Sequence, residues 1–300
     1  MKKRLFCLLT VSVLLLFPLC GLSETVEKGA WNAYVHSYTN KDGQAAEMAY
    51  ELYFPASWDG ETALPLLTYI PDAGYVGRGV KAVETAECPK YWLTEEMTEK
   101  HPAIWLILDI SDADSDVRVE GNQSAQIMPI IERVCAEYPI DTDRLYLTGQ
   151  SMGGIMDFAL NTFYPDTFAA TVYIACQPGG EVHDAIYDEI LEAEAYLNQK
   201  FVYFCSRLDI KAHVGQDDVE ERLISRGAEF GKLYGLTAKS DTLNEEAAAL
   251  LNQGYEKNLL GFEQIVVTKD GSVSMMEHMK SFSYAYKATA LMDWLFAQSK

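Results

Sequence analysis

The chain has 300 residues, of which 49% are hydrophobic, so it can bury a sizeable core in one large α/β domain or two smaller ones. Its formal net charge is -20 at pH 7. This charge excludes nucleic acid and anionic membranes as natural partners, because their phosphates would be repelled, and it suits neutral or cationic substrates.

The first 23 residues have the pattern of an export signal. Basic residues at positions 2–4 precede an apolar run, Leu5 to Leu19, of 15 residues. That run is shorter than the roughly 20 residues that a membrane-spanning helix needs. Small residues then precede a cleavage site before Glu24. We therefore expect a secreted or periplasmic protein without stable membrane insertion. Lipid anchoring at Cys20 is the alternative.

Cleavage would leave four cysteines, Cys88, Cys135, Cys176 and Cys205. Export permits disulfides, but four cysteines allow three full pairings, so the pairing stays open. Cys176 and Cys205 follow or end apolar runs, which is typical of strand cores. The chain has no CxxC motif and no Cys/His metal spacing, and we therefore predict no zinc site.

The elements of the first half predict one edge of a sheet. Residues 31–39 and 48–54 alternate apolar and polar residues, and Asp42-Gly43 between them favours a turn, so the pair is expected to be antiparallel. Residues 64–70 and 104–110 are continuous apolar runs, which indicate strands buried on both faces.

The second half alternates helices and strands. We expect helices at 126–138, 184–199, 217–234 and 281–298, and strands at 144–148, 169–175, 201–205 and 262–268. This order predicts one α/β domain over 24–300, with a mostly parallel sheet of about eight strands covered by helices on both faces. The irregular stretch 235–261 is expected to be a surface insertion.

The strand at 144–148 leads into Gly149-Gln-Ser-Met-Gly153, which fits the G-x-S-x-G nucleophile elbow. A serine on such a sharp strand-to-helix turn needs glycine neighbours, because side chains there would collide. Ser151 is therefore the candidate nucleophile. The N–H of Met152, at the start of the following helix, is a candidate donor to a developing oxyanion.

A serine hydroxyl needs a base, and the base needs an orienting acid. His278 follows the last expected strand, and Asp209 lies just past the strand at 201–205, which completes the order Ser, Asp, His. Asp217 and Asp218 are the fallback acids. His213, close to Asp209 in sequence, is the rival base.

The second oxyanion donor is expected from the loop after residues 64–70. The N–H of Ala73 is the first choice and that of Gly74 the second, because Pro71 has no N–H. Tyr75 and Gln150 are expected to contact the substrate. No metal or organic cofactor is expected.

With these residues in place, the chain resembles the α/β-hydrolases. The segment Ile140 to Gly154 is similar to an Asp-x-x-Arg-x-Tyr-x-x-Gly-x-Ser-Met-Gly-Gly motif of secreted esterases related to polyhydroxybutyrate depolymerases and feruloyl esterases. The resemblance implies a Ser/Asp/His esterase without a cofactor. The chain departs from that group at Pro71-Asp72, where the group usually has His-Gly. This departure matters because a carboxylate beside an oxyanion hole would oppose the negative charge that the hole must stabilise.

Three functions remain open. The first is a secreted hydrolase of feruloyl, acetyl or short-chain esters, free or linked to polysaccharide. The second is a serine peptidase of the prolyl-oligopeptidase type, although only about 40 mature residues precede the first buried strand, too few for a propeller domain. The third is a non-catalytic binding protein on a hydrolase scaffold, for which the Pro71-Asp72 departure is the argument.

Overall fold

In a computed structural model of the chain, the structure describes residues 26–75, 77–79, 81–84, 89–111, 116–176, 194–236, 240–263 and 276–300. The expected signal segment and Cys20 lie outside these residues. So does Cys88. The expected helix at 184–199 also lies largely outside them.

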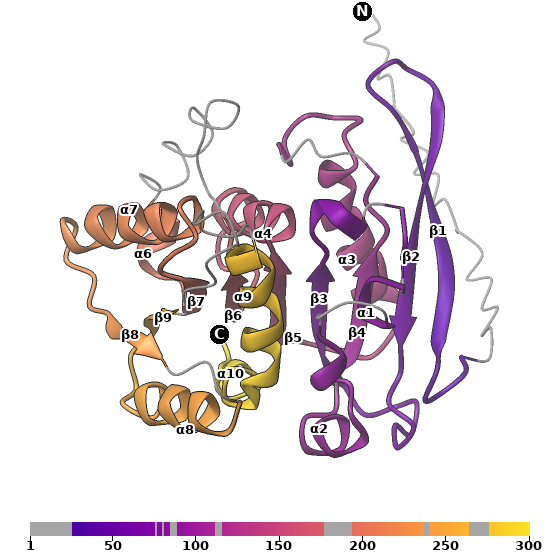
Figure 1. The fold of residues 1–300 in the computed structure, drawn as a ribbon. Helices are drawn as coiled ribbons and strands as arrows, with labels where there is room; N and C mark the ends of the chain where they lie inside the picture. Colours follow the sequence, from indigo (N-terminus) through magenta and orange to yellow (C-terminus); the bar gives the residue numbers. More distant parts are fainter. Residues whose placement is uncertain are drawn as a thin grey trace, which may run out of the picture.

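The described strands form one nine-stranded sheet in the order β1-β2-β4-β3-β5-β6-β7-β9-β8 (Figure 1). They are β1 (Trp31–Thr39), β2 (Ala45–Tyr53), β3 (Leu64–Ile70), β4 (Ile104–Leu108), β5 (Ile140–Gln150), β6 (Ala170–Ile174), β7 (Phe201–Ser206), β8 (Gly231–Leu236) and β9 (Lys257–Phe262). The β1–β2 and β2–β4 pairs are antiparallel and all other pairs are parallel. The predicted α/β class, mostly parallel sheet and antiparallel edge are confirmed.

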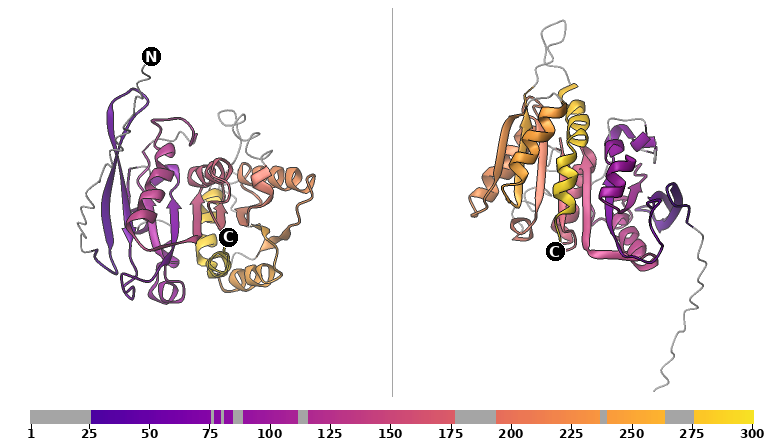
Figure 2. Two further views of the ribbon diagram at one scale, coloured as in Figure 1. Left: turned by 180° about the vertical axis from the view of Figure 1, so that it is seen from behind. Right: turned by 90° about the horizontal axis from the view of Figure 1, so that it is seen from below.

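Helices flank this sheet on both faces (Figure 2). The α-helices are α1 (Lys81–Glu84), α2 (Glu95–Lys100), α3 (Ile127–Glu137), α4 (Met152–Phe163), α6 (Glu194–Leu197), α7 (Ala212–Ile224), α8 (Ser240–Leu251), α9 (Met276–Lys287) and α10 (Thr289–Phe296). Among the described residues there are also three short 3-10 helices, η1 (Ala73–Tyr75), η2 (Pro89–Tyr91) and η3 (Ser124–Gln126). Strands β3, β4, β6 and β7 are buried at every residue, which explains their largely apolar sequences.

The expected helix at 217–234 is wrong in its second part. Helix α7 ends at Ile224, and Gly227 follows it with a φ of 92°. The N–H of Gly227 donates to Ile224 O and that of Ala228 to Leu223 O, which is a Schellman helix end. The chain then forms β8, the edge strand beyond β9.

The stretch 235–261 is not a surface insertion. It contains α8 and most of β9, and β9 is buried throughout and lies between β7 and β8. Polar Lys257 and Asn258 and the glycine at 261 hide this strand in the sequence. The strand expected at 262–268 therefore starts five residues earlier, and residues 264–268 lie outside those described. The single helix expected at 281–298 is two helices, α9 and α10, separated at Ala288.

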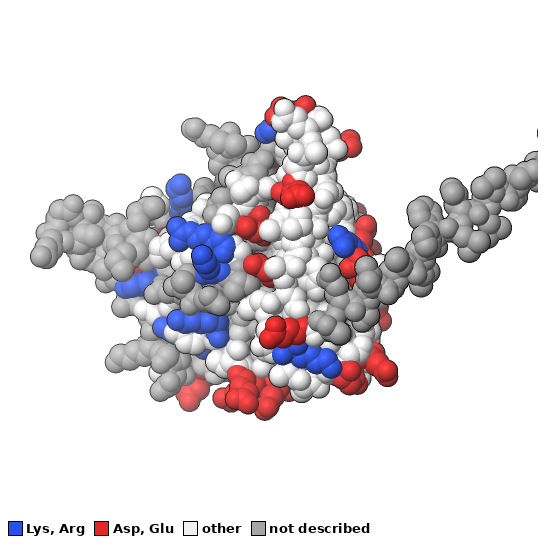
Figure 3. Space-filling model, turned by 90° about the vertical axis from the view of Figure 1, so that its right-hand side faces the viewer, with Lys and Arg blue, Asp and Glu red and all other residues white. Residues whose placement is uncertain are grey.

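Cys176 and Cys205 are fully buried thiols in the core, as their apolar surroundings predicted. Cys135 is half-buried and also free. Within the described residues, no helix has the length and apolar character needed to cross a membrane. The face beside β1 carries Lys and Arg as well as Asp and Glu (Figure 3), so the negative net charge does not make that face uniformly acidic.

Candidate active site

Ser151 is the single residue that connects β5 to α4, and its backbone has φ 52° and ψ -117°. A positive φ is costly for a residue with a side chain, so this backbone is strained. The tight turn depends on glycines. A Cβ on Gly149 would lie 2.6 Å from the carbonyl carbon of Gly153, and one on Gly154 would lie 2.5 Å from Cys176 Cβ. These contacts explain why glycine is required at Gly149, the first position of the elbow motif, and at Gly154, directly after the motif.

The structure brings Ser151, His278 and Asp209 together at the carboxyl end of the sheet. His278 Nε2 lies 3.0 Å from Ser151 Oγ, and His278 Nδ1 lies 2.6 Å from Asp209 Oδ2. Ser151 follows β5, Asp209 follows β7, and His278 lies in the first turn of α9. Parallel strands deliver these distant segments to one edge.

Asp209 is buried, with 7% of its surface exposed. Burial alone would raise the pKa of its carboxyl group. Its hydrogen bond and charge interaction with His278, together with the N–H groups of Ala212 and Lys211, outweigh burial and lower the pKa below the ordinary value. An ionised Asp209 can only accept, so His278 Nδ1 carries the proton. Nε2 is then free to accept from the hydroxyl of Ser151.

The rival residues occupy other positions. The fallback acids form ion pairs elsewhere, Asp217 with Arg207 and Asp218 with Arg222. His213 lies in the first turn of α7, where its Nδ1 is 2.7 Å from the backbone oxygen of Asp209. None of the three has a described contact with Ser151.

Two backbone N–H groups, those of Met152 and Ala73, are the candidate oxyanion donors. Met152 begins α4, so its N–H is one of the unsatisfied donors of a helix N-terminus. Ala73 begins η1, in the loop that follows β3. Among the described residues, neither N–H has a hydrogen-bond partner. β3 pairs with β5 in parallel, with Ile70 opposite Gly149, so these two loops are neighbours.

Asp72 does not leave a bare carboxylate beside this site. Its Oδ1 accepts from the N–H of Gly74 at 2.7 Å, and its Oδ2 accepts from Gln150 Nε2 at 2.7 Å. The Gly74 N–H is therefore already used, which favours Ala73 as the donor. Gln150 is completely buried and donates to Asp72, and its expected contact with the substrate stays a prediction. Tyr75 is half-buried at the end of η1, with the Arg78 guanidinium 5.5 Å from its ring centre.

A polar cluster that the sequence did not predict lies next to His278 and at the end of the strand that leads to Asp209. Buried Glu277 directly precedes His278 and accepts from Ser206 Oγ at 3.1 Å. Ser281 Oγ accepts the Ser206 N–H at 3.0 Å. These bonds join the first two turns of α9 to the end of β7. The only sequence signal was the polar Ser206 at the end of an apolar run.

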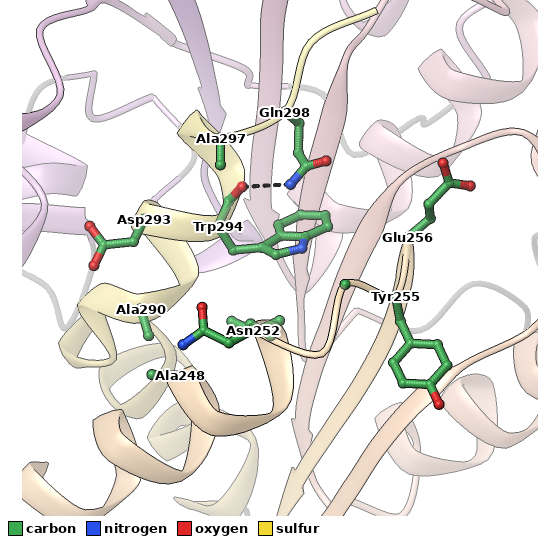
Figure 4. A pocket seen from close by; sticks show the side chains of 11 residues that line it. Ala248, Asn252, Tyr255, Glu256, Ala290, Asp293, Trp294, Ala297 and Gln298 are labelled. Carbon is green, nitrogen blue, oxygen red and sulfur yellow. Dashed lines mark hydrogen bonds between the residues drawn. The ribbon is translucent and has the colours of Figure 1, made fainter.

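A separate cavity of about 430 Å³ lies between α8, α10 and the start of β9 (Figure 4). Trp294, Asn252 and Tyr255 are among the residues that line it. Because Tyr255 precedes β9, this cavity lies at the amino end of that strand, the opposite edge of the sheet from Ser151. Within the described part of the chain, no group of three His, Cys, Asp or Glu residues is arranged to hold a metal ion.

The sheet order, the elbow and the side chains at its edge define the α/β-hydrolase fold. No model of a known protein family matches the chain. Feruloyl esterase B of Talaromyces stipitatus is 31% identical over 81 residues, which are 26% of this chain and 23% of that relative.

Solved esterase structures share the fold. A thermostable esterase has a TM-score of 0.59 at 18% identity, over 89% of this chain and 63% of its own length. The feruloyl esterase module from Clostridium thermocellum, as a variant in complex with sinapinate, has a TM-score of 0.55 at 14% identity, over 87% of this chain and 88% of that one. These similarities agree with the esterase group that the elbow segment resembles, and they confirm the fold.

Proposed function

We propose that the protein is a secreted serine hydrolase of carboxylic esters, with Ser151 as nucleophile, His278 as base and Asp209 as the acid that orients it. One observation carries the proposal, the chain of two hydrogen bonds from Ser151 Oγ through the imidazole to Asp209 Oδ2. A nucleophile within 3.0 Å of a base that is itself held by a buried carboxylate is the arrangement that acyl transfer requires.

The reaction has two halves. Ser151 Oγ attacks the ester carbonyl carbon while His278 Nε2 takes the hydroxyl proton, and the oxyanion accepts from the N–H groups of Met152 and Ala73. The tetrahedral adduct collapses, and the alcohol leaves with the proton from Nε2. Water then attacks the acyl-enzyme, again giving its proton to Nε2. The second collapse releases the carboxylic acid and returns the proton to Ser151.

The substrate we propose is an ester of an aromatic or short-chain acid, free or attached to polysaccharide. The similarity to feruloyl esterase B and to the feruloyl esterase module supports the aromatic acid. The export pattern of residues 1–23 supports action outside the cytoplasm.

Hydrolysis of p-nitrophenyl acetate and methyl ferulate by the mature protein tests this function. Ser151→Ala and His278→Ala should each lose at least ~10³-fold in kcat/KM. His36→Ala is the matched control, because this histidine lies on β1 and contacts Gln126, and it should retain full activity.

A fluorophosphonate probe separates the alternatives. No turnover and no labelling of Ser151 would rule out a serine hydrolase and leave a binding role. Labelling with cleavage of peptide p-nitroanilides, but not of esters, would point to a peptidase. Loss of activity in His213→Ala but not in His278→Ala would show that His213, and not His278, is the base.

A further inference from the structure

The loop that supplies the Ala73 N–H is tied to the strand that carries the nucleophile. The tie is the Asp72 carboxylate, which accepts from Gly74 within its own loop and from Gln150 at the end of β5. Gln150 directly precedes Ser151. The two loops that hold the two oxyanion donors are therefore joined through one side chain.

Both carboxylate oxygens of Asp72 are committed to donors, and the side chain is 5% exposed. Its backbone oxygen also accepts the N–H of Tyr75 at 3.0 Å. These bonds wind the chain into η1 and consume the N–H groups of Gly74 and Tyr75. Among the donors of this described turn, the N–H of Ala73 is the one left over.

The same contacts reduce the electrostatic cost of an acid at this place. The N–H groups of Gly74 and of the Gln150 amide both point at the carboxylate. The carboxylate faces Gln150, which is completely buried. The negative charge is therefore partly offset before an oxyanion forms.

We propose that Asp72 is a positioning residue, whose bridge between Gly74 and Gln150 holds the Ala73 N–H in place to bind the oxyanion. The inference rests on the proposed ester hydrolysis and explains how Pro71-Asp72 can replace the usual His-Gly. A donor displaced from the oxyanion loses its effect on the transition state but not on substrate binding. The bridge therefore acts on kcat rather than on KM.

Three variants test the bridge. Asp72→Ala removes both bonds and should lower kcat on p-nitrophenyl acetate by about 10²-fold, the usual loss for one oxyanion donor, with KM changed less than about 3-fold. Asp72→Asn keeps both bonds once the Gln150 amide turns about its last bond, and should retain kcat within about 3-fold. Gln150→Met removes one of the two bonds without substituting a residue of the loop and should lower kcat by about 10-fold.

Binding of phenylboronic acid gives a second measurement. It forms a tetrahedral adduct on the serine whose oxygen occupies the oxyanion position, so its inhibition constant should rise in Asp72→Ala by the same factor as kcat falls. Asp59→Ala is the matched control. Asp59 also caps a turn, through the N–H groups of Glu61 and Thr62, but on an exposed loop, and its loss should leave both measurements unchanged.

Four outcomes would overturn the inference. These are full kcat in Asp72→Ala, an equal loss in Asp72→Asn, a rise in KM alone, and an unchanged inhibition constant. Each leaves the proposed function standing as long as Ser151→Ala is inactive. If Asp72→Ala does not fold, Gln150→Met decides the question, and full kcat there also overturns the bridge. An inactive wild type that resists fluorophosphonate would remove the proposed function and the inference with it.

Discussion

Gly153 lies directly against the carbonyl group of Ile70. A Cβ built on Gly153 would be 2.0 Å from Ile70 O and 2.8 Å from Pro71 O. Both atoms are backbone, so neither can move aside as a side-chain end could. This contact presses the first turn of α4 against the end of β3, and it thereby sets the spacing between the two proposed oxyanion donors.

Gly153→Ala should therefore lower kcat/KM by at least ~10²-fold. The added methyl group would force the start of α4 and the end of β3 apart, and with them the two proposed oxyanion donors. Gly43→Ala is the control. Gly43 has a φ of 75° and nothing within 4 Å of its added Cβ, so alanine there should cost about 1 kcal/mol of stability and no activity. Thermal unfolding and ester hydrolysis measure the two effects. A fully active Gly153→Ala would show that the spacing is not critical.

Asp209→Asn should reduce kcat by about 10³- to 10⁴-fold. The asparagine amide would donate to His278 Nδ1, so the imidazole proton would move to Nε2. A protonated Nε2 can no longer accept the proton of the Ser151 hydroxyl. Fluorophosphonate labelling should slow in parallel. A loss below about 10-fold would mean that Asp209 does not orient the base.

The same variant should change how stability depends on pH. The folded-state pKa of Asp209 is lowered, so this residue stabilises the fold above the pKa of the unfolded chain, and that contribution disappears as the pH falls through the folded-state pKa. Urea unfolding should show the wild type losing its advantage over Asp209→Asn between about pH 5 and pH 3. A constant difference over that window would contradict the lowered pKa.

Asp157 should have the opposite pH dependence. This residue of α4 is completely buried, and among the described residues neither of its carboxyl oxygens has a hydrogen-bond partner. Burial raises the pKa of Asp157 well above the ordinary 3.8. Its contribution to stability is therefore complete below that value and is lost as the pH rises toward the folded-state pKa.

Asp157→Asn should consequently gain stability over the wild type as the pH rises from 4 to 8, by about 1 kcal/mol or more, the free energy of one pKa unit. Asp166→Asn controls for the loss of one charge, since Asp166 is exposed and asparagine accepts its φ of 61°. Urea unfolding at both pH values gives the comparison. A gain equal to that of the control would show that Asp157 is not a buried neutral acid.

Ser281→Ala should destabilise the protein by about 1–3 kcal/mol, because it leaves the buried N–H of Ser206 without an acceptor. It should also lower kcat more than it changes KM. The bond joins the end of β7, just before Asp209, to α9, which carries His278, so its loss should disturb how these two residues meet. Ser225→Ala removes a similar serine-to-backbone bond from an exposed helix end and should have little effect. Equal stability of the two variants would exclude a supporting role for the cluster.

Most of the sheet was predictable because its strands are buried on both faces. Residues 64–70, 104–108 and 201–205 are largely apolar runs, and such runs indicate central strands without any knowledge of their neighbours. β8 and β9 escaped because their sequences mix polar residues and glycines with apolar ones. β9 is nevertheless completely buried, since β7 and β8 lie on either side of it.

The candidate site was predictable to the extent that chain order limits it. The elbow is a local pattern, and the order Ser, Asp, His then directs attention to polar residues after the last strands. The partner of Gln150 was not predictable in this way. Its side-chain amide donates to Asp72, which follows the neighbouring strand β3, and closeness to Ser151 in sequence does not indicate that contact.

The sequence by itself determined the sharp turn at Ser151, because the G-x-S-x-G pattern that predicts it is local, although the contact that requires glycine at 153 is with Ile70 on β3. It also determined the parallel α/β layering, through alternating apolar runs. Only the tertiary structure decided which histidine and which aspartate meet Ser151, and where the Asp72 carboxylate points. Those choices depend on side chains 58 to 127 residues apart, or on neighbouring strands, and folding alone brings them within hydrogen-bond distance.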